Sequence, residues 1–348
     1  MKVIHFDSGL GNQMSIYAEY IAMKMANPND VIYMEDISYY IPECNEVLCM
    51  WNGYELERLF GIKIRNISEL FTSEEWAEIL SEVRNSEFWK EDWNYPPTIC
   101  EILKKHGIEL VNTCKSNFII DEKQFKRCLR IVLRRMRASK IGNMIIRTGM
   151  RIFEKQIITR EASFRNMFIS SNNDLYFGQT GNALFRGSGI EKIEKTLRET
   201  FVFPELKDEQ NIDVAKQMKE SNSVSIHARR GDLMYGVEYN YTNDYFKRSV
   251  NFIKRNVSSP HFYIFSDPES VGWVEHNINV LGITDKDWYK VINWNLGENS
   301  YIDMQLMAMC KHNIIVKSSY GFWGAYLNPN PHKIVCSPDI RINTNHHF

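Results

Sequence analysis

A histidine, two arginines and an aspartate form the densest group of chemically capable residues in the sequence. His227, Arg229, Arg230 and Asp232 stand within six positions, at the end of the predicted strand 223–227 and directly after it. Guanidinium groups bind phosphate oxygens through two parallel hydrogen bonds, so this group predicts an anion site for a phosphate-bearing substrate. The alternative is a surface loop in which Asp232 pairs with Arg230 and the other charges face solvent.

Two serines near the end of the chain offer a second anion site. Ser318 and Ser319 follow the apolar stretch 314–316 and precede the helical pattern of 320–327. Backbone N–H groups at a helix N-terminus bind anions, although a serine there can equally be an ordinary helix cap worth about 1 kcal/mol. Asp267 also ends an apolar stretch, where it either contacts a nucleotide or caps a helix.

Asp303 is a single acid in an otherwise apolar helix start, sixteen residues before Ser319. It either caps that helix or accepts hydrogen bonds from N1–H and the 2-amino group of guanine. The glycine turn at 9–13 matches half of a dinucleotide fingerprint. Because Met14 occupies the third glycine position, we reject dinucleotide binding. The Asp-x-Asp triplet at 285–287 lies in a polar loop and is more typical of a solvated loop than of a metal site.

Alternating strands and helices are expected to position these residues. Apolar runs and helical spacing predict strands at 3–6, 31–34, 223–227, 261–265 and 313–316, and helices at 14–25, 245–255, 303–310 and 320–327. This alternation predicts parallel sheets covered by helices, and in such sheets ligands bind beyond the carboxyl ends of the strands. The segment 68–118 is expected to be helical with loops, and Pro96-Pro97 to break it.

Length and composition limit the protein classes. A chain of 348 residues with 44% hydrophobic residues predicts two globular domains, and its net charge of −1 gives no general attraction to nucleic acid. No run of about 18 apolar residues is present, which excludes an integral membrane protein. Seven cysteines without a CxxC pair, and a beginning unlike a signal peptide, favour reduced thiols in a cytoplasmic protein.

The segment 123–160 concentrates positive charge. It holds twelve Lys or Arg residues against the single acid Glu154, so it carries +11 while the rest of the chain carries −12. Basic residues surround an apolar face at helical spacing, which predicts an amphipathic basic helix. Three interpretations of this helix are open: its charged face is simply solvated, it binds an anionic membrane surface, or it binds nucleic acid. Nucleic acid ranks last because no stacking aromatic residues accompany the charge, and we expect no nucleic-acid partner.

Taken together, these motifs resemble the bacterial α-1,2-fucosyltransferases of glycosyltransferase family 11. The similar segments occur in the family's order and include its HxRRGD signature; they are 9–18, 34–40, 54–62, 227–232 and 303–323. The chain departs from the family pattern at Ser15, Gly321 and Phe322, where aromatic or serine residues are usual. These departures leave the residues expected at the donor phosphates unchanged and bear on which sugar is transferred and to which acceptor.

The resemblance implies an α/β fold class of the GT-B type, with two Rossmann-like domains facing across a cleft. Residues 1–175 would form the acceptor-side domain, including the basic helical segment 123–160, and residues 176–348 would bind GDP-fucose. It also implies inversion at the anomeric carbon without a metal or other cofactor. Positive side chains would then neutralise the leaving diphosphate.

The resemblance also implies roles for individual residues. Arg229 would bind the β-phosphate, Asp303 the guanine, and Asp232 would orient the arginine loop. The other donor-binding residues are His227, Arg230, Asp267, Ser318, Ser319, Gly11 and Gln13. Independently of the resemblance, an inverting displacement needs a base for the acceptor hydroxyl. Asn12 could position the acceptor, and either Asp36 or Asp7 could deprotonate it; a structural role for Asp36 is the alternative.

The expected activity is transfer of L-fucose from GDP-fucose to O2 of a terminal galactose in a surface glycan such as an O-antigen. Transfer from another GDP-sugar, or to another hydroxyl, is the alternative among enzymes. A non-catalytic, membrane-docked sugar- or nucleotide-binding protein is the alternative from another class. The expected location is the cytoplasm, with association with the inner membrane face through 123–160.

Overall fold

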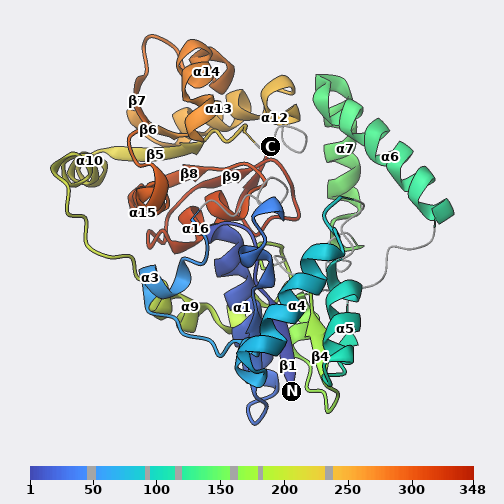
Figure 1. Cartoon of the computed structure of the whole chain (residues 1–348). Coiled ribbons are helices and arrows are strands. Elements are labelled where there is room, and N and C mark those ends of the chain that lie inside the picture. The colour runs from blue at the N-terminus through green and yellow to red at the C-terminus, as the bar shows by residue number, and fades with distance from the viewer. Residues whose placement is uncertain (45–51, 91–94, 114–119, 157–163, 179–182, 232–237) are drawn as a thin grey trace. The chain divides into compact units, whose positions relative to one another are not determined.

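The chain forms two compact units, which are described separately. The computed structural model describes residues 1–44, 52–90, 95–113, 120–156, 164–178, 183–231 and 238–348. The first unit comprises residues 1–118 and 161–202, and the second comprises 119–160 and 203–348 (Figure 1). Asp232 lies outside the described residues, so its predicted role in orienting the arginine loop stays a prediction.

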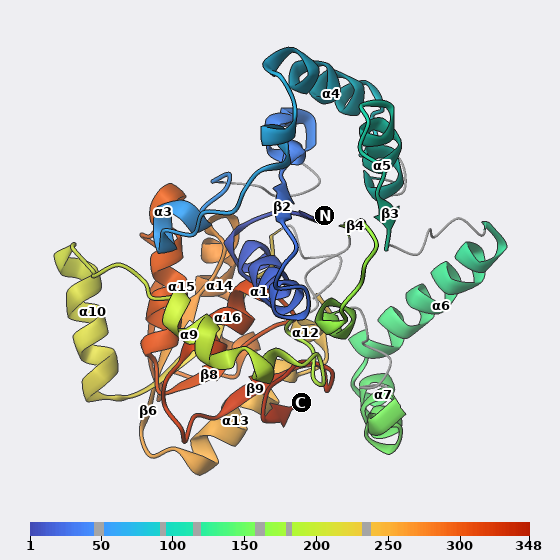
Figure 2. The same ribbon diagram turned by 90° about the horizontal axis from the view of Figure 1, so that it is seen from below.

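The first unit is built on a four-stranded parallel sheet in the order β2-β1-β4-β3. Helix α1 lies on one face, and α4 and α5 pack on the other (Figure 2). Its strands and α-helices are β1 (Lys2–His5), α1 (Leu10–Ala26), β2 (Ile32–Glu35), α3 (Leu56–Phe60), α4 (Ser73–Asn85), α5 (Tyr95–Lys105), β3 (Val111–Asn112), β4 (Leu175–Phe177) and α9 (Glu194–Thr200). The predicted strands at 3–6 and 31–34 and the helix between them are confirmed.

Helix α5 corrects one expectation. Pro96 and Pro97 do not break the segment; they occupy the first turn of a helix that begins at Tyr95. A proline is accommodated there because the first N–H groups of a helix have no partner within it. Helix α4 begins conventionally, since Thr72 and Glu75 form a reciprocal capping box.

The second unit contains a six-stranded parallel sheet in the order β10-β9-β8-β5-β6-β7. Read from β7, this is the doubly wound order 3-2-1-4-5-6, whose direction reverses between β5 and β8. Its strands and α-helices are α10 (Glu209–Glu220), β5 (Asn222–His227), α12 (Tyr239–Thr242), α13 (Tyr245–Asn256), β6 (Pro260–Phe265), α14 (Val271–His276), β7 (Trp288–Ile292), α15 (Tyr301–Met309), β8 (His312–Ile314), α16 (Ser319–Leu327), β9 (Val335–Ser337) and β10 (His346–His347). The predicted strands and helices of this half are confirmed.

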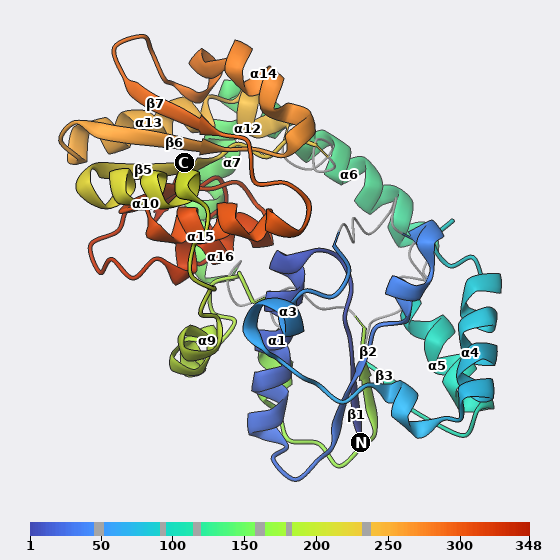
Figure 3. The ribbon, with the colours of Figure 1, turned by 60° about the vertical axis from the view of Figure 1, so that its left-hand side comes forward.

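Helices cover both faces of this sheet. Helices α13 and α14 lie on one side, and α10, α15 and α16 lie on the other (Figure 3). The core under α13 contains wholly buried residues such as Ile226 of β5, Phe246 of α13 and Ile264 of β6. Strand β6 is buried from Phe262 to Phe265, and its sequence is an apolar run, which is why the pattern predicted it.

The basic segment forms two helices, α6 (Ile120–Ala138) and α7 (Lys140–Ile152), rather than one. Ser139 separates them and caps α7 through a hydrogen bond from the N–H of Gly142. The pair belongs to the second unit, whereas the sequence assigned 123–160 to a domain ending at residue 175. Ion pairs of Arg134 with Glu238 (3.1 Å) and Lys140 with Asp244 (2.7 Å) explain the difference, because they tie both helices to the elements around α12.

The predicted α/β fold class with two Rossmann-like units is confirmed by the two parallel sheets and their helical layers. Among the described helices, none combines the length and apolar character that a bilayer span requires. The described cysteines are free thiols: Cys44, Cys100, Cys128, Cys310 and Cys336.

Candidate active site

The arginine motif and the double serine meet at the switch point of the second sheet. Strand β5 ends at His227 and pairs with β8, which leads to Ser318 and Ser319 at the start of α16. A reversal of strand order opens a ligand site beyond the carboxyl ends of these two strands. The fold therefore brings together two groups that lie about ninety residues apart in the sequence.

Arg229 and Arg230 have different surroundings although they are adjacent. The Arg230 guanidinium lies 3.6 Å from the ring centroid of Trp273 and 5.5 Å from that of Tyr241. Such stacking favours a fixed guanidinium. Arg229 is partly exposed, and its carbonyl accepts a hydrogen bond from the Tyr241 hydroxyl at 2.9 Å. Both arginines are partly exposed, and we infer that the stacked Arg230 anchors the loop that carries Arg229.

Asp267, at the end of β6, holds this loop through its backbone. Its Oδ1 accepts the N–H of Arg230 at 2.7 Å, and its Oδ2 accepts the N–H of Gly231 at 3.1 Å. A Cβ on Gly231 would lie only 2.9 Å from Asp267 Oδ2, so the close approach requires glycine at this position. The structure thus places the predicted donor-binding Asp267 under the arginine loop as its support.

His227 joins the end of β5 to the first turn of α16. Its ring is 4% exposed, and its Nδ1 lies so close to Gly321 that a Cβ there would be 2.4 Å away. Burial, assisted by the charge of Arg229, lowers the pKa of His227 to about 3, so the imidazole is neutral at physiological pH. The departure from the family at Gly321 therefore has a structural reason.

Asp303 lies in the first turn of α15 at the end of a chain of amide hydrogen bonds. Its Oδ1 accepts from Asn295 at 2.7 Å, and Asn295 in turn exchanges hydrogen bonds with buried Asn211. Burial raises the pKa of Asp303 to about 7, although the hydrogen bond from Asn295 works in the opposite direction. The Tyr320 hydroxyl accepts the N–H of Met304 at 3.0 Å, which fixes α15 against α16.

The glycine turn of the first unit is an internally bonded structure. The Gln13 side-chain amide donates to the carbonyl of Gly53 at 2.8 Å, and its carbonyl accepts the N–H of Glu55 at 2.8 Å. Gln13 and Gly11 are both buried, whereas Asn12 is partly exposed on α1. Gln13 therefore fixes the turn, and among these predicted residues Asn12 is the one whose side chain reaches the surface.

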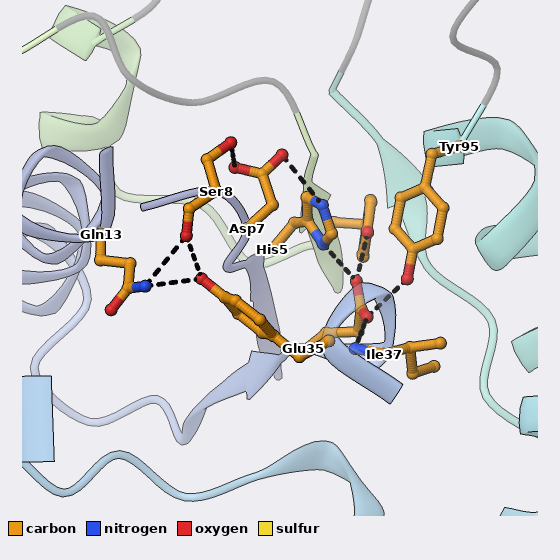
Figure 4. Close-up of polar contacts among 9 residues, drawn as sticks. His5, Asp7, Ser8, Gln13, Glu35, Ile37 and Tyr95 are labelled. Carbon is orange, nitrogen blue, oxygen red and sulfur yellow. Dashed lines mark hydrogen bonds and ion pairs between the residues drawn. The ribbon is translucent and has the colours of Figure 1, made fainter. Parts of the chain in front are cut away.

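A buried ion pair lies at the carboxyl end of the same sheet (Figure 4). His5 Nδ1 lies 2.8 Å from Glu35 Oε2, and both residues are fully buried. Burial alone would lower the pKa of His5, but the negative charges of Glu35 and Asp7 and their hydrogen bonds raise it to about 10. Burial likewise opposes ionisation of Glu35, and His5 with the hydroxyls of Tyr95 and Tyr176 keeps the pKa of Glu35 below its ordinary value.

The two candidate bases differ in accessibility. Asp36 is 6% exposed, and its Oδ1 accepts a hydrogen bond from Asn66 at 2.7 Å. Burial raises the pKa of Asp36 to about 6, partly offset by Asn66. The Asp7 side chain is 20% exposed, and its Oδ2 lies 3.4 Å from His5 Nε2.

The structure thus places six of the predicted donor-binding residues beyond the carboxyl ends of neighbouring strands of the second sheet: His227, Arg229, Arg230, Asp267, Ser318 and Ser319. Asp303 lies in α15, the helix that follows β7. Gly11, Asn12, Gln13 and Asp36 lie in the first unit. Sequence reasoning missed His5 and Glu35. A charged residue at the last position of each of two apolar strands was the available signal.

Among the described residues no group of three or more His, Cys, Asp or Glu side chains is arranged to hold a metal ion. Asp287 of the Asp-x-Asp triplet accepts hydrogen bonds from the N–H of Thr284 at 2.7 Å and from Lys254 at 2.6 Å. This carboxylate therefore stabilises its own loop.

Comparison with known proteins finds a family model that matches most of the second unit and the last residues of the first. Residues 192–340 match the model of Glycosyl transferase family 11. The "O-antigen biosynthesis glycosyltransferase WbnK" of Escherichia coli is 34% identical over 125 residues, which are 34% of this chain and 39% of that protein. An "Alpha-1,2-colitosyltransferase" of Escherichia coli is 34% identical over 126 residues, 34% of this chain and 41% of that protein. These matches span about two fifths of each relative's length.

Solved structures show more distant similarity along most of the chain. The "NodZ alpha-1,6-fucosyltransferase co-crystallized with GDP" has 12% identity and a TM-score of 0.44, covering 99% of this chain and 98% of that one. The "E. coli ADP-heptose lps heptosyltransferase II" has 10% identity and a TM-score of 0.37, covering 97% and 83%. The family match at 192–340 contains every described second-unit residue that the sequence assigned to the donor.

Proposed function

We propose that this chain, which carries a segment of glycosyltransferase family 11 at residues 192–340, transfers L-fucose from GDP-β-L-fucose to O2 of a terminal galactose in a surface glycan. The carrying observation is that Arg229 follows β5 and Ser318-Ser319 follows β8, the two strands that pair at the switch point of the sheet. The relatives' names, an O-antigen glycosyltransferase and an α-1,2-colitosyltransferase, support a glycan acceptor and a 1,2 linkage.

Positive charge at this edge replaces a divalent cation in the proposed mechanism. As the bond between fucose and the β-phosphate breaks, negative charge grows on the departing GDP. The Arg229 guanidinium and the N–H groups at the start of α16 are preorganised donors, which stabilise the transition state more than the ground state. Inversion then follows from direct attack of the acceptor hydroxyl on the anomeric carbon, opposite the leaving group.

Calorimetry with GDP, GDP-fucose and GDP-mannose tests the donor. We expect binding of GDP and GDP-fucose; a preference for GDP-mannose would indicate a transferase for another sugar. Absence of GDP binding would favour the non-catalytic binding protein. Incubation with labelled GDP-fucose and a panel of galactosides, analysed by mass, tests the transfer. Activity that is lost in chelator and restored by manganese would contradict the metal-independent mechanism.

The carboxyl group of Asp303 predicts a pH dependence of GDP affinity. Its pKa of about 7 in the free protein means that part of the population is protonated at neutral pH. Guanine offers two N–H donors to the ionised form, so binding lowers this pKa and releases protons. We expect GDP affinity to fall as the pH is lowered from about 8 to 6, up to tenfold per pH unit below the free-protein pKa. Calorimetry across this range checks it, and Asp303→Asn should bind GDP weakly with little pH dependence.

The paired helices α6 and α7 favour an additional partner, an anionic membrane surface. Large apolar side chains on α7 are exposed, including Ile141 at 71%, Ile145 at 55% and Ile152 at 70%. Beside them, burial and the charges of Arg248 and Arg151 lower the pKa of Arg147 to about 10. Buried Nε and Nη2 of Arg248 have no hydrogen-bond partner among the described residues. Clustered guanidiniums next to apolar side chains complement lipid phosphates next to acyl chains.

Vesicle co-sedimentation tests this partner. We expect binding to vesicles that contain phosphatidylglycerol, little binding to pure phosphatidylcholine vesicles, and weakening by salt. Arg147→Gln should reduce the binding roughly fivefold, because each basic residue near an anionic surface contributes about 1 kcal/mol to the binding free energy. Ile145→Glu should reduce it further, whereas Ile212→Glu, at an exposed apolar position of α10, is the matched control. Equal binding to both vesicle types would contradict an electrostatic contribution.

A further inference from the structure

We propose that Asp7 is the general base that deprotonates the acceptor hydroxyl, and that the buried His5–Glu35 pair behind it is its positioning device. This inference rests on the proposed glycosyl transfer and adds an acceptor-activating site on the first unit. Three acidic or basic side chains lie in line at the carboxyl ends of β1 and β2: Glu35, His5 and Asp7 (Figure 4). Only the last of them reaches solvent, at 20% exposure.

Glu35 is fully occupied as an acceptor. Its Oε1 receives the Tyr95 hydroxyl at 2.5 Å and the N–H of Ile37 at 2.7 Å. Its Oε2 receives His5 Nδ1 at 2.8 Å and the Tyr176 hydroxyl at 2.7 Å. A carboxylate with four donors has no free position for a substrate proton. Glu35 therefore serves as the counter-charge that keeps His5 protonated.

The protonated ring of His5 directs its second N–H toward Asp7. At neutral pH the imidazolium has two donors, one engaged by Glu35 and the other 3.4 Å from Asp7 Oδ2. Because Glu35 balances the imidazolium charge, the pair orients Asp7 without adding a net positive charge beside it. The Ser8 hydroxyl donates to Asp7 Oδ1 at 3.1 Å, and the charge of His5 attracts Oδ2, while 20% of the Asp7 side chain stays exposed.

The backbone after Asp7 is held in a costly conformation. Ser8 has a φ of 60°, in the left-handed region that non-glycine residues rarely adopt. Its carbonyl accepts hydrogen bonds from Gln13 at 2.9 Å and from the Tyr39 hydroxyl at 2.7 Å, and these contacts maintain the strain. Strained residues that are fixed in this way cluster at catalytic sites. Asp36, the alternative base, is buried and bonded to Asn66, so it is less accessible to an acceptor.

The chemical step is balanced without a further reactant. The acceptor O–H bond breaks, its proton moves to the Asp7 carboxylate, and the oxygen forms a bond to the anomeric carbon. The bond between that carbon and the phosphate oxygen breaks, and its electron pair leaves with GDP. After product release, Asp7 returns the proton to solvent.

Steady-state transfer by Asp7→Asn tests the assignment. We expect kcat to fall by roughly two to four orders of magnitude, the usual contribution of a general base, while the GDP affinity measured by calorimetry is unchanged. Asp174→Asn is the matched control, since Asp174 is a half-exposed carboxylate at the opposite end of the same sheet. Formate should restore part of the activity of Asp7→Ala by supplying a carboxylate in the vacated space. His5→Gln should lower kcat roughly tenfold with an unchanged KM for the donor.

The outcomes separate this proposal from the function on which it rests. An active wild-type protein whose Asp7→Asn variant keeps its kcat, or whose Asp7→Ala variant ignores formate, would overturn the base while leaving the transfer intact. A wild-type protein that binds no GDP and transfers no sugar would overturn both.

Discussion

Replacing Arg229 by lysine is expected to lower the kcat of sugar transfer by roughly two to four orders of magnitude while the protein stays folded. A charge-assisted hydrogen bond is worth roughly 1.5–3 kcal/mol, and a guanidinium makes two of them to a phosphate in parallel. Lysine keeps the charge but loses the second bond and the planar geometry. Because charge on the β-phosphate grows during the reaction, the loss affects kcat more than the affinity for GDP.

Two other arginines serve as controls for this variant. Arg255 is exposed at the end of α13, near the amino ends of the strands, so Arg255→Lys should have wild-type kinetics. Arg230→Lys loses the stacking on Trp273, and we expect a smaller fall in kcat because its guanidinium supports the loop. Steady-state kinetics and circular dichroism of the three variants make the comparison. Nearly wild-type turnover in Arg229→Lys would contradict its role at the phosphate.

Local patterns predicted the central strands well because burial on both faces leaves a simple signal. The expected strand at 261–265 is β6 (Pro260–Phe265), and the expected helix at 245–255 is α13 (Tyr245–Asn256). Strand β7 (Trp288–Ile292) was missed because it lies at a sheet edge, where its first residues are exposed. Short edge strands take their conformation from the neighbour with which they pair, and that neighbour is distant in sequence.

The donor side of the site was predictable where one motif carries the chemistry, as in His227 to Gly231 and in Ser318-Ser319. Its supporting contacts were not, because they join residues far apart in the chain. Asp267 binds the backbone of Arg230 across 37 positions, and Asn211 reaches Asn295 across 84. The grouping of the basic segment with the second unit could not be read from the sequence for a related reason: its partners, Glu238 and Asp244, come about a hundred residues later.

His5 and Glu35 show how strand register creates a site that a single sequence conceals. The two residues are directly paired across the parallel strands β1 and β2. Each is the last residue of its strand: His5 lies inside the predicted strand 3–6, and Glu35 directly follows the predicted strand 31–34. Their contact depends on a register that no local preference determines.

The same pair carries the largest expected effect on stability. Glu35→Leu should lower the free energy of unfolding by about 3–5 kcal/mol, because it leaves a buried imidazolium and two buried tyrosine hydroxyls without their acceptor. Chemical denaturation at neutral pH, followed by circular dichroism, measures the change. A loss of this size is a large part of a typical stability of about 5–15 kcal/mol. Glu35→Gln keeps the shape of the side chain and one oxygen acceptor, so it should be destabilised less and is the variant to measure if Glu35→Leu does not fold. Glu109→Leu, which removes an exposed partner of Lys104, is the control and should change little.

Two further measurements distinguish a lost ion pair from lost packing. The double variant His5→Leu/Glu35→Leu should be less destabilised than the sum of its single variants, because it leaves no unpaired charge. The pKa of His5 is about 10 in the folded protein and 6.5 when unperturbed, so the folded state binds the additional proton between these values. The wild-type protein should therefore lose stability as the pH rises from 6.5 toward 10, and Glu35→Leu should lack this loss. Additive single variants with parallel pH profiles would show that Glu35 acts through shape alone.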